Sequence, residues 1–67
     1  MSGEFYTSIY TGGEEYQIRV DKATDKYYIY MIGFEVDTLV HTSYSKKNME
    51  AFIEDLYYDN VDYDMNL

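Results

Sequence analysis

Apolar and polar residues alternate along the first part of the chain with the period of two that is typical of β-strands. The first alternating stretch covers residues 4–10 and ends at Gly12 and Gly13, two residues that permit the positive φ angles of a hairpin turn. The second covers residues 14–20, and a polar segment at 21–26 follows it. The pattern therefore predicts two antiparallel strands, with a second turn leading into a third.

The third strand is predicted at residues 27–32, where both faces are apolar or aromatic, as expected of a central strand. Gly33 interrupts the pattern, and residues 39–42 form a short candidate fourth strand. Residues 34–36 fit two interpretations, since they would either extend the third strand or open the fourth.

A helix is the clearest prediction in the second part of the chain. Ser43 or Ser45 provides an N-cap. The apolar residues after it recur at i, i+3, i+4, i+7 and i+8 and form one stripe: Met49, Phe52, Ile53, Leu56 and Tyr57. The pattern fades after Tyr58 or Asp59, so the helix is expected to end there.

The last residues, 60–67, alternate again, which is consistent with either a frayed tail or a final strand at the sheet edge. The fold class predicted is α+β: a three- or four-stranded antiparallel β-meander packed on one face by a single C-terminal α-helix. Residues 1–67 form one small domain, with an ordered core over about 4–60 and an acidic tail over 60–67.

The alternation also predicts which sheet face the helix covers. The covered face is expected to carry Phe5, Ile9, Ile18, Val20, Ile29 and Met31. Tyr6, Tyr10, Tyr28 and Tyr30 would then share the opposite face. That face would be exposed, as a ladder of aromatic side chains or as a second contact surface, including a homodimer face.

Composition excludes several classes of protein. The 67 residues contain no cysteine, so neither disulfides nor thiolate zinc sites can form. With 13 acids against 5 bases and a net charge of −8, direct binding to nucleic acid is not expected, because phosphate contacts need clustered Lys and Arg. No stretch approaches the length of a membrane span, so no membrane association is expected and the expected location is the cytoplasm.

The negative charge is concentrated near the C-terminus. Residues 1–47 hold seven acids and all five bases, whereas residues 48–67 hold six acids and no base. On a helical wheel Glu50 and Glu54 flank one side of the apolar stripe, and Asp55 and Asp59 flank the other. One interpretation is a solvated surface that keeps a small protein soluble; the other is a docking surface for a basic partner.

Tyrosines among these acids favour the docking interpretation, because tyrosine is enriched at protein interfaces. The predicted partner-binding residues are Glu50, Glu54, Asp55, Tyr57, Tyr58, Asp59, Asp62, Tyr63 and Asp64. The sequence offers little catalytic chemistry beside them. His41 lacks a nucleophile motif, and Asp62-x-Asp64-x-Asn66 lacks the glycine and distal glutamate of a calcium loop. No enzyme activity, metal or cofactor is expected.

In size, acidity and placement of acids on the C-terminal helix and tail, the chain is similar to small phage-encoded inhibitors. These include anti-CRISPR and anti-restriction proteins that mimic nucleic acids, and the resemblance implies action in the host cytoplasm. The leading hypothesis is a stoichiometric inhibitor that docks on a basic nucleic-acid-handling protein. The alternative is a structural or assembly module that self-associates through the tyrosine-rich sheet face or a sheet edge.

Overall fold

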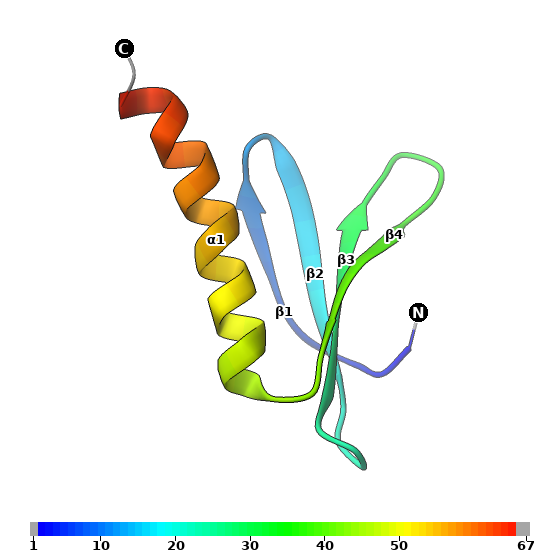
Figure 1. Ribbon diagram of the computed structural model, residues 1–67. Helices are drawn as coiled ribbons and strands as arrows, with labels where there is room; N and C mark the ends of the chain where they lie inside the picture. Colours follow the sequence, from blue (N-terminus) through cyan, green and yellow to red (C-terminus); the bar gives the residue numbers. More distant parts are fainter. Residues whose placement is uncertain (1, 66–67) are drawn as a thin grey trace.

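The computed structural model describes residues 2–65, and side chains as far as Tyr58. It consists of β1 (Glu4–Thr11), β2 (Glu14–Asp21), β3 (Lys26–Ile32), β4 (Thr38–Ser43) and α1 (Lys46–Met65). The strands form one antiparallel sheet in the order β1-β2-β3-β4, and α1 lies against one face of it (Figure 1). The predicted α+β class, with a four-stranded meander and one C-terminal helix, is confirmed.

Local turn chemistry explains the first two connections. Gly12 and Gly13 have φ angles of 62° and 80°, the left-handed conformation that a two-residue hairpin needs and that glycine adopts without strain. In the next turn the Asp21 carboxylate accepts a hydrogen bond from the Ala23 N–H at 3.0 Å. The Asp21 carbonyl accepts another from the Thr24 N–H at 3.2 Å. Both turns join strands that are adjacent in the chain, so the meander needs no crossover.

The connection between β3 and β4 differs from both interpretations of residues 34–36. These residues belong to neither strand and form a loop instead. The Gly33 N–H donates to the Asp37 carboxylate at 3.3 Å, which closes the loop at its base. The Val36 carbonyl lies so close to Gly33 that a Cβ would have no room there. The loop therefore folds back at Gly33, where the strand pattern would have continued.

Helix α1 begins as expected and ends later than expected. The Ser45 hydroxyl accepts a hydrogen bond from the Asn48 N–H at 3.1 Å, so Ser45 is the N-cap and Ser43 is not. The helix then continues to Met65, past the predicted end at Tyr58 or Asp59. The final strand, one of the two alternatives for residues 60–67, is wrong as far as Met65, because the chain is helical there. The alternation that suggested a strand lies in a part of the helix that extends beyond the sheet (Figure 1).

The core is small and lies between the sheet and the first half of the helix. Its buried members are Ile18, Val20, Tyr27, Ile29 and Met49. Ile9, Tyr16, Phe52 and Ile53 are half-buried against it. The predicted apolar stripe of the helix is confirmed for Met49, Phe52 and Ile53, whereas Tyr57 is exposed. The helix therefore packs tightly near its start and less tightly along its length.

A β-bulge in β1 changes the predicted distribution of side chains. The register between β1 and β2 shifts between Phe5 and Thr7, so Tyr6 has no partner in the ladder. Tyr6 packs edge-on against Tyr27, with ring centroids 5.9 Å apart, and so lies on the helix-covered face. Phe5 pairs with Arg19 and is exposed. The predictions that the helix covers Phe5 and that Tyr6 joins the open face are therefore wrong.

The topology separates charges between the two ends of the sheet. The basic end comprises the turn between β2 and β3 together with the start of α1 (Figure 1). It carries four bases, Lys22, Lys26, Lys46 and Lys47, beside three acids, Glu4, Asp21 and Asp25. The acidic end comprises the turn between β1 and β2, the 33–37 loop and the second half of α1. Its sheet-side acids are Glu14, Glu15, Glu35 and Asp37. The topology thus separates the acidic end from an end whose bases and acids nearly balance.

Candidate functional site

The outer surface of α1 carries the predicted partner-binding residues whose side chains are described. Glu50, Glu54 and Asp55 are exposed, and so are Tyr57 and Tyr58. The carboxylates lie on two sides of the helix, as its periodicity predicts. Glu50 and Glu54 border a groove beside β1, whereas Asp55 borders a depression beside β4. Both long sides of the helix therefore present carboxylates to solvent.

The other predicted residues in this set belong to the last turns of the helix. Asp59, Asp62, Tyr63 and Asp64 lie within α1, but their side chains fall outside the described residues. Their backbone continues the helix toward the acidic end. The structure thus brings all nine predicted residues onto one helix, instead of dividing them between a helix and a tail.

No base neutralises the helix carboxylates within the described side chains. The ion pair found among these is Lys22–Glu4 at 3.3 Å, an exposed pair at the basic end. Glu50 and Glu54 are four residues apart, so their like charges face each other across one helical turn. An unpaired array of this kind favours association with positive charge and makes it sensitive to salt.

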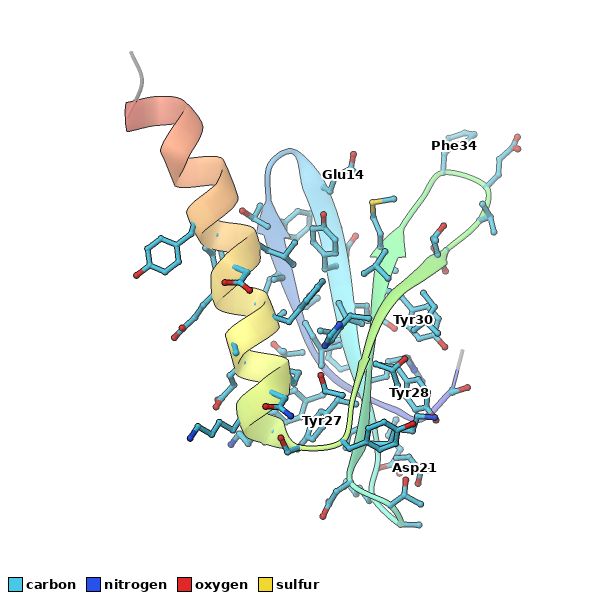
Figure 2. The ribbon with its side chains drawn as sticks, viewed as in Figure 1. Glu14, Asp21, Tyr27, Tyr28, Tyr30 and Phe34 are labelled. Carbon is cyan, nitrogen blue, oxygen red and sulfur yellow. The ribbon has the colours of Figure 1, made fainter. Side chains whose placement is uncertain are left out.

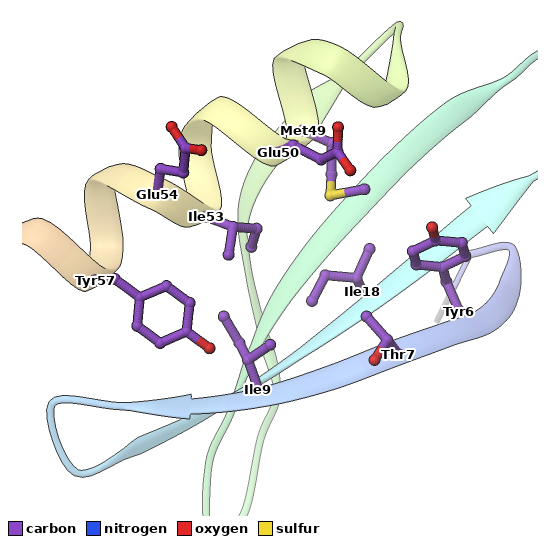
Figure 3. A pocket seen from close by; sticks show the side chains of 9 residues that line it. All are labelled: Tyr6, Thr7, Ile9, Ile18, Met49, Glu50, Ile53, Glu54 and Tyr57. Atoms are coloured by element: carbon purple, nitrogen blue, oxygen red, sulfur yellow. The ribbon is translucent and has the colours of Figure 1, made fainter.

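The groove beside β1 lies between the sheet and the helix. It has a volume of about 440 Å³, and its lining residues come from two strands and the helix: Tyr6, Thr7, Ile9, Ile18, Met49, Glu50, Ile53, Glu54 and Tyr57. Figure 3 shows Ile9, Ile18 and Ile53 directed toward the space between β1 and α1, with Tyr6 and Tyr57 near its two ends. The floor is therefore apolar, and the helix side carries two carboxylates.

The depression beside β4 contains His41, which packs against the helix. The imidazole stacks on Phe52, with ring centroids 4.0 Å apart and an interplanar angle of 8°. Its Nε2 atom lies 2.7 Å from the Ser43 hydroxyl oxygen. Ser43 is only 4% exposed and belongs to the buried interior. His41 and Ser43 thus act as a packing pair that joins β4 to the helix.

Within the part of the chain that the structure describes, no group of three or more His, Cys, Asp or Glu residues could hold a metal ion. In the same residues, no helix is long and apolar enough to cross a membrane.

The open face of the sheet carries three of the four predicted tyrosines, Tyr10, Tyr28 and Tyr30. Tyr28 and Tyr30 stack with ring centroids 6.5 Å apart. The Lys26 ammonium lies 5.2 Å from the Tyr28 ring centroid and 5.3 Å from that of Tyr44. This arrangement combines aromatic stacking with cation–π contacts. Tyr44 was not recognised in the sequence, because it lies in the connection between β4 and the helix.

The N-terminal residues cover part of this open face. The Arg19 guanidinium donates to the Gly3 carbonyl at 2.7 Å and also to the Ser2 carbonyl at 3.2 Å. The Ser2 N–H donates to the Tyr30 hydroxyl at 3.1 Å. Arg19 is therefore engaged within the protein, and the tyrosine face is smaller than the strand alternation predicts.

An exposed apolar tip marks the acidic end, and sequence reasoning missed it. Phe34 is fully exposed, and Val36, Leu39 and Val40 are also exposed. Figure 2 shows Phe34 at the far end of the loop between β3 and β4. The sequence did contain a signal, because residues 34–36 could be assigned clearly to neither the third nor the fourth strand. A segment of this kind often belongs to a loop.

The chain matches no known protein family, no curated protein and no solved structure.

Proposed function

We propose that this protein is a small acidic binding module, and that it inhibits a basic nucleic-acid-handling protein by occupying the surface that normally contacts nucleic acid. The observation that carries this proposal is the exposed and unpaired set of carboxylates Glu50, Glu54 and Asp55 on both sides of α1. The phage anti-defence role suggested by composition fits this mode of action. In this proposal the complex forms in the cytoplasm of the host cell.

The charge separation supports the same mode of binding. Four of the five bases lie at the basic end beside Glu4, Asp21 and Asp25, which leaves that end close to neutral. The sequence has no base after Lys47, so a positively charged partner would be drawn to the helix. Complementary potentials of this kind raise the association rate and fix the orientation of approach. Tyr57 and Tyr58 would then supply contact area that a purely ionic surface lacks.

The test is a capture experiment with matched baits. The binding variant carries Glu54→Lys, Asp55→Lys and Asp59→Lys, and the control carries Glu4→Lys, Glu14→Lys and Glu35→Lys. Both variants change the net charge by the same amount, but only the first changes the helix. We expect wild type and the control to capture a nucleic-acid-binding protein at low salt and to release it to duplex DNA.

The helix variant should lose this capture while it keeps the circular dichroism spectrum of the wild type. Equal capture by the helix variant would overturn the proposal. Equal loss in both variants would show that net charge alone drives the association, which also contradicts a specific docking surface.

A second candidate function is self-association through the open sheet face. The observation that favours it is the stacked pair Tyr28–Tyr30, which Lys26 links to the exposed Tyr44. Tyr10 is exposed on the same sheet face, two strands away. Because Ser2 and Gly3 already cover part of this face, its free area is limited. The test is sedimentation equilibrium of wild type and of Tyr28→Ser/Tyr30→Ser over a wide concentration range. A dimer that the double variant loses would support assembly, and a monomer at millimolar concentration would exclude it.

A further inference from the structure

The groove between β1 and α1 points to the form of the partner segment. We propose that it binds an extended segment of a basic protein, which pairs with the edge of β1 and places one aliphatic side chain in the groove, with a Lys or Arg on each side of it. This inference deepens the proposed function and rests on it for the identity of the partner as a basic protein. It adds a binding mode that the acidic helix alone does not imply.

The backbone of β1 provides the first part of the argument. β1 is an edge strand that pairs only with β2 in the described residues, so its outer edge is available for main-chain hydrogen bonds. Tyr6, Thr7 and Ile9 lie on this strand and also line the groove. A segment added along residues 7–10, beyond the register shift between Phe5 and Thr7, would therefore place alternate side chains into the groove, as in other cases of strand addition.

The floor of the groove provides the second part. Ile9, Ile18, Ile53 and Met49 make it apolar, and its volume of about 440 Å³ is within the range of specific binding sites. Ile18 is 0% exposed and Met49 is 3% exposed, so an occupant would contact mainly the half-buried Ile9 and Ile53. A branched aliphatic side chain suits such a surface, because burial of its methyl groups is favourable and demands no hydrogen bond.

The rim provides the third part, because its charge selects the occupant. Glu50 and Glu54 stand on the helix side of the groove, and no described cation pairs with them (Figure 3). In an extended segment, residues two positions before and after the aliphatic residue point to the same side, toward these carboxylates. Lys or Arg at these two positions would complete the site.

A second copy of the chain would fit the groove less well, because of the negative charge on the rim. Its most exposed apolar group is Phe34, and the neighbours of that residue are Glu35 and Asp37. Insertion of this tip would bring their carboxylates close to Glu50 and Glu54, and like charges at an interface oppose binding. The groove therefore favours a basic segment over self-association.

The experiment uses a synthetic peptide as the probe, with the sequence Thr-Lys-Thr-Ile-Thr-Lys-Thr and blocked ends. It is titrated into the isotope-labelled full chain, and backbone amide shifts are followed by NMR. Two comparison peptides replace both lysines by glutamate or the isoleucine by serine. We expect shifts at Thr7, Ile9 and Ile53 with the first peptide, and at least about tenfold weaker binding of the other two.

Two pairs of variants locate the binding. Thr7→Trp would fill the groove from β1, whereas Ser8→Trp places the same side chain on the opposite face of the same strand. We expect binding to be lost in the first and kept in the second. Glu50→Gln/Glu54→Gln should weaken binding about tenfold, whereas Glu14→Gln/Glu35→Gln should not. The glutamine pairs keep side-chain size, so they report charge even if Thr7→Trp fails to fold.

Each outcome of the NMR titrations either supports or overturns the proposed binding mode. Shifts confined to the groove, with the expected order of peptides, support the proposal. It is overturned if millimolar peptide produces no shifts, if the glutamate peptide binds equally well, or if shifts occur on the open face. It is also overturned if groove signals depend on protein concentration alone and change on Phe34→Ser, since a second copy would then occupy the site.

Failure of this inference can be separated from failure of the proposed function. Peptide binding without capture of a nucleic-acid-handling protein would support the groove and contradict the inhibitor role. Capture that depends on Asp55 and Asp59, without peptide binding, would support the inhibitor role and contradict the groove.

Discussion

The two ends of the sheet differ in packing as well as in charge. Near the basic end, Val20, Tyr27, Ser43 and Met49 are all buried, and the helix is capped by Ser45. Near the acidic end, Tyr10, Phe34, Val36 and Tyr57 are all exposed. A domain of 67 residues can bury only part of its apolar surface, and this one buries it where the helix starts. Stability and the candidate binding surface are thereby placed in different parts of the molecule.

The strongest test of this difference exchanges an aliphatic residue at the core for alanine. Ile29 is 0% exposed, so Ile29→Ala should lower the free energy of unfolding by about 2–5 kcal/mol. The corresponding fall in Tm is about 4–8 °C for each kcal/mol. Phe34→Ala at the acidic end should change the free energy by less than about 0.5 kcal/mol. Thermal unfolding followed by circular dichroism measures both, and similar losses would contradict the separation of packing.

The same comparison can be made within the helix. Met49 is 3% exposed, and its truncation in Met49→Ala should cost about 2–3 kcal/mol. Tyr57 lies two turns later and is exposed, so Tyr57→Ala should cost less than about 1 kcal/mol. Urea unfolding provides the values. A larger loss at Tyr57 would mean that the second half of the helix packs on the sheet more closely than the structure indicates.

Removal of the helix N-cap, at the basic end, is expected to lower stability by a smaller amount. Ser45→Ala removes the acceptor for the Asn48 N–H and should lower stability by about 1 kcal/mol. Ser8→Ala, at an exposed position in β1, is the control and should have little effect. Ser45→Asp should retain the wild-type value, because aspartate also caps a helix. Loss of stability in Ser45→Asp would argue that the hydroxyl serves another purpose.

The smallest expected effect is an increase in the free energy of unfolding. Glu54→Lys replaces a like-charge pair at i, i+4 with an attractive pair to Glu50, which should stabilise the fold by about 0.3–0.5 kcal/mol. The gain should shrink in 1 M NaCl, where exposed charges are screened. Glu14→Lys provides the control at the other side of the acidic end. A destabilised Glu54→Lys variant would show that Glu54 has a structural role in the helix.

These differences also explain what the sequence could predict. The strands, the glycine turn and the start of the helix follow local rules, and residues such as Gly12, Gly13 and Ser45 signal them directly. The positions of Phe5 and Tyr6 could not be predicted, because the bulge between them involves no glycine or proline. Once the register shifts by one residue, the side chains before the shift change faces.

The candidate site was also predictable only where it follows from local sequence rules. Helical periodicity placed Glu50 and Glu54 on one side of the stripe and Asp55 on the other. It could not reveal that the helix leaves a groove over Ile9 and Ile53, because both residues fit the pattern of a closed core. The extent of the helix past Tyr58 was also hidden, since an amphipathic pattern is needed only where a helix covers a sheet.

The bulge near the start of β1 has a consequence for colloidal behaviour. An uninterrupted edge strand exposes a long, regular row of backbone N–H and C=O groups. Other copies of the chain can pair with this row, and repeated pairing produces fibrils. The register shift between Phe5 and Thr7 breaks that row close to one end. A short guest can still pair beyond the break, but a full-length copy would meet mismatched spacing. The β-bulge thus opposes aggregation through β1 in a protein whose sheet has two edge strands.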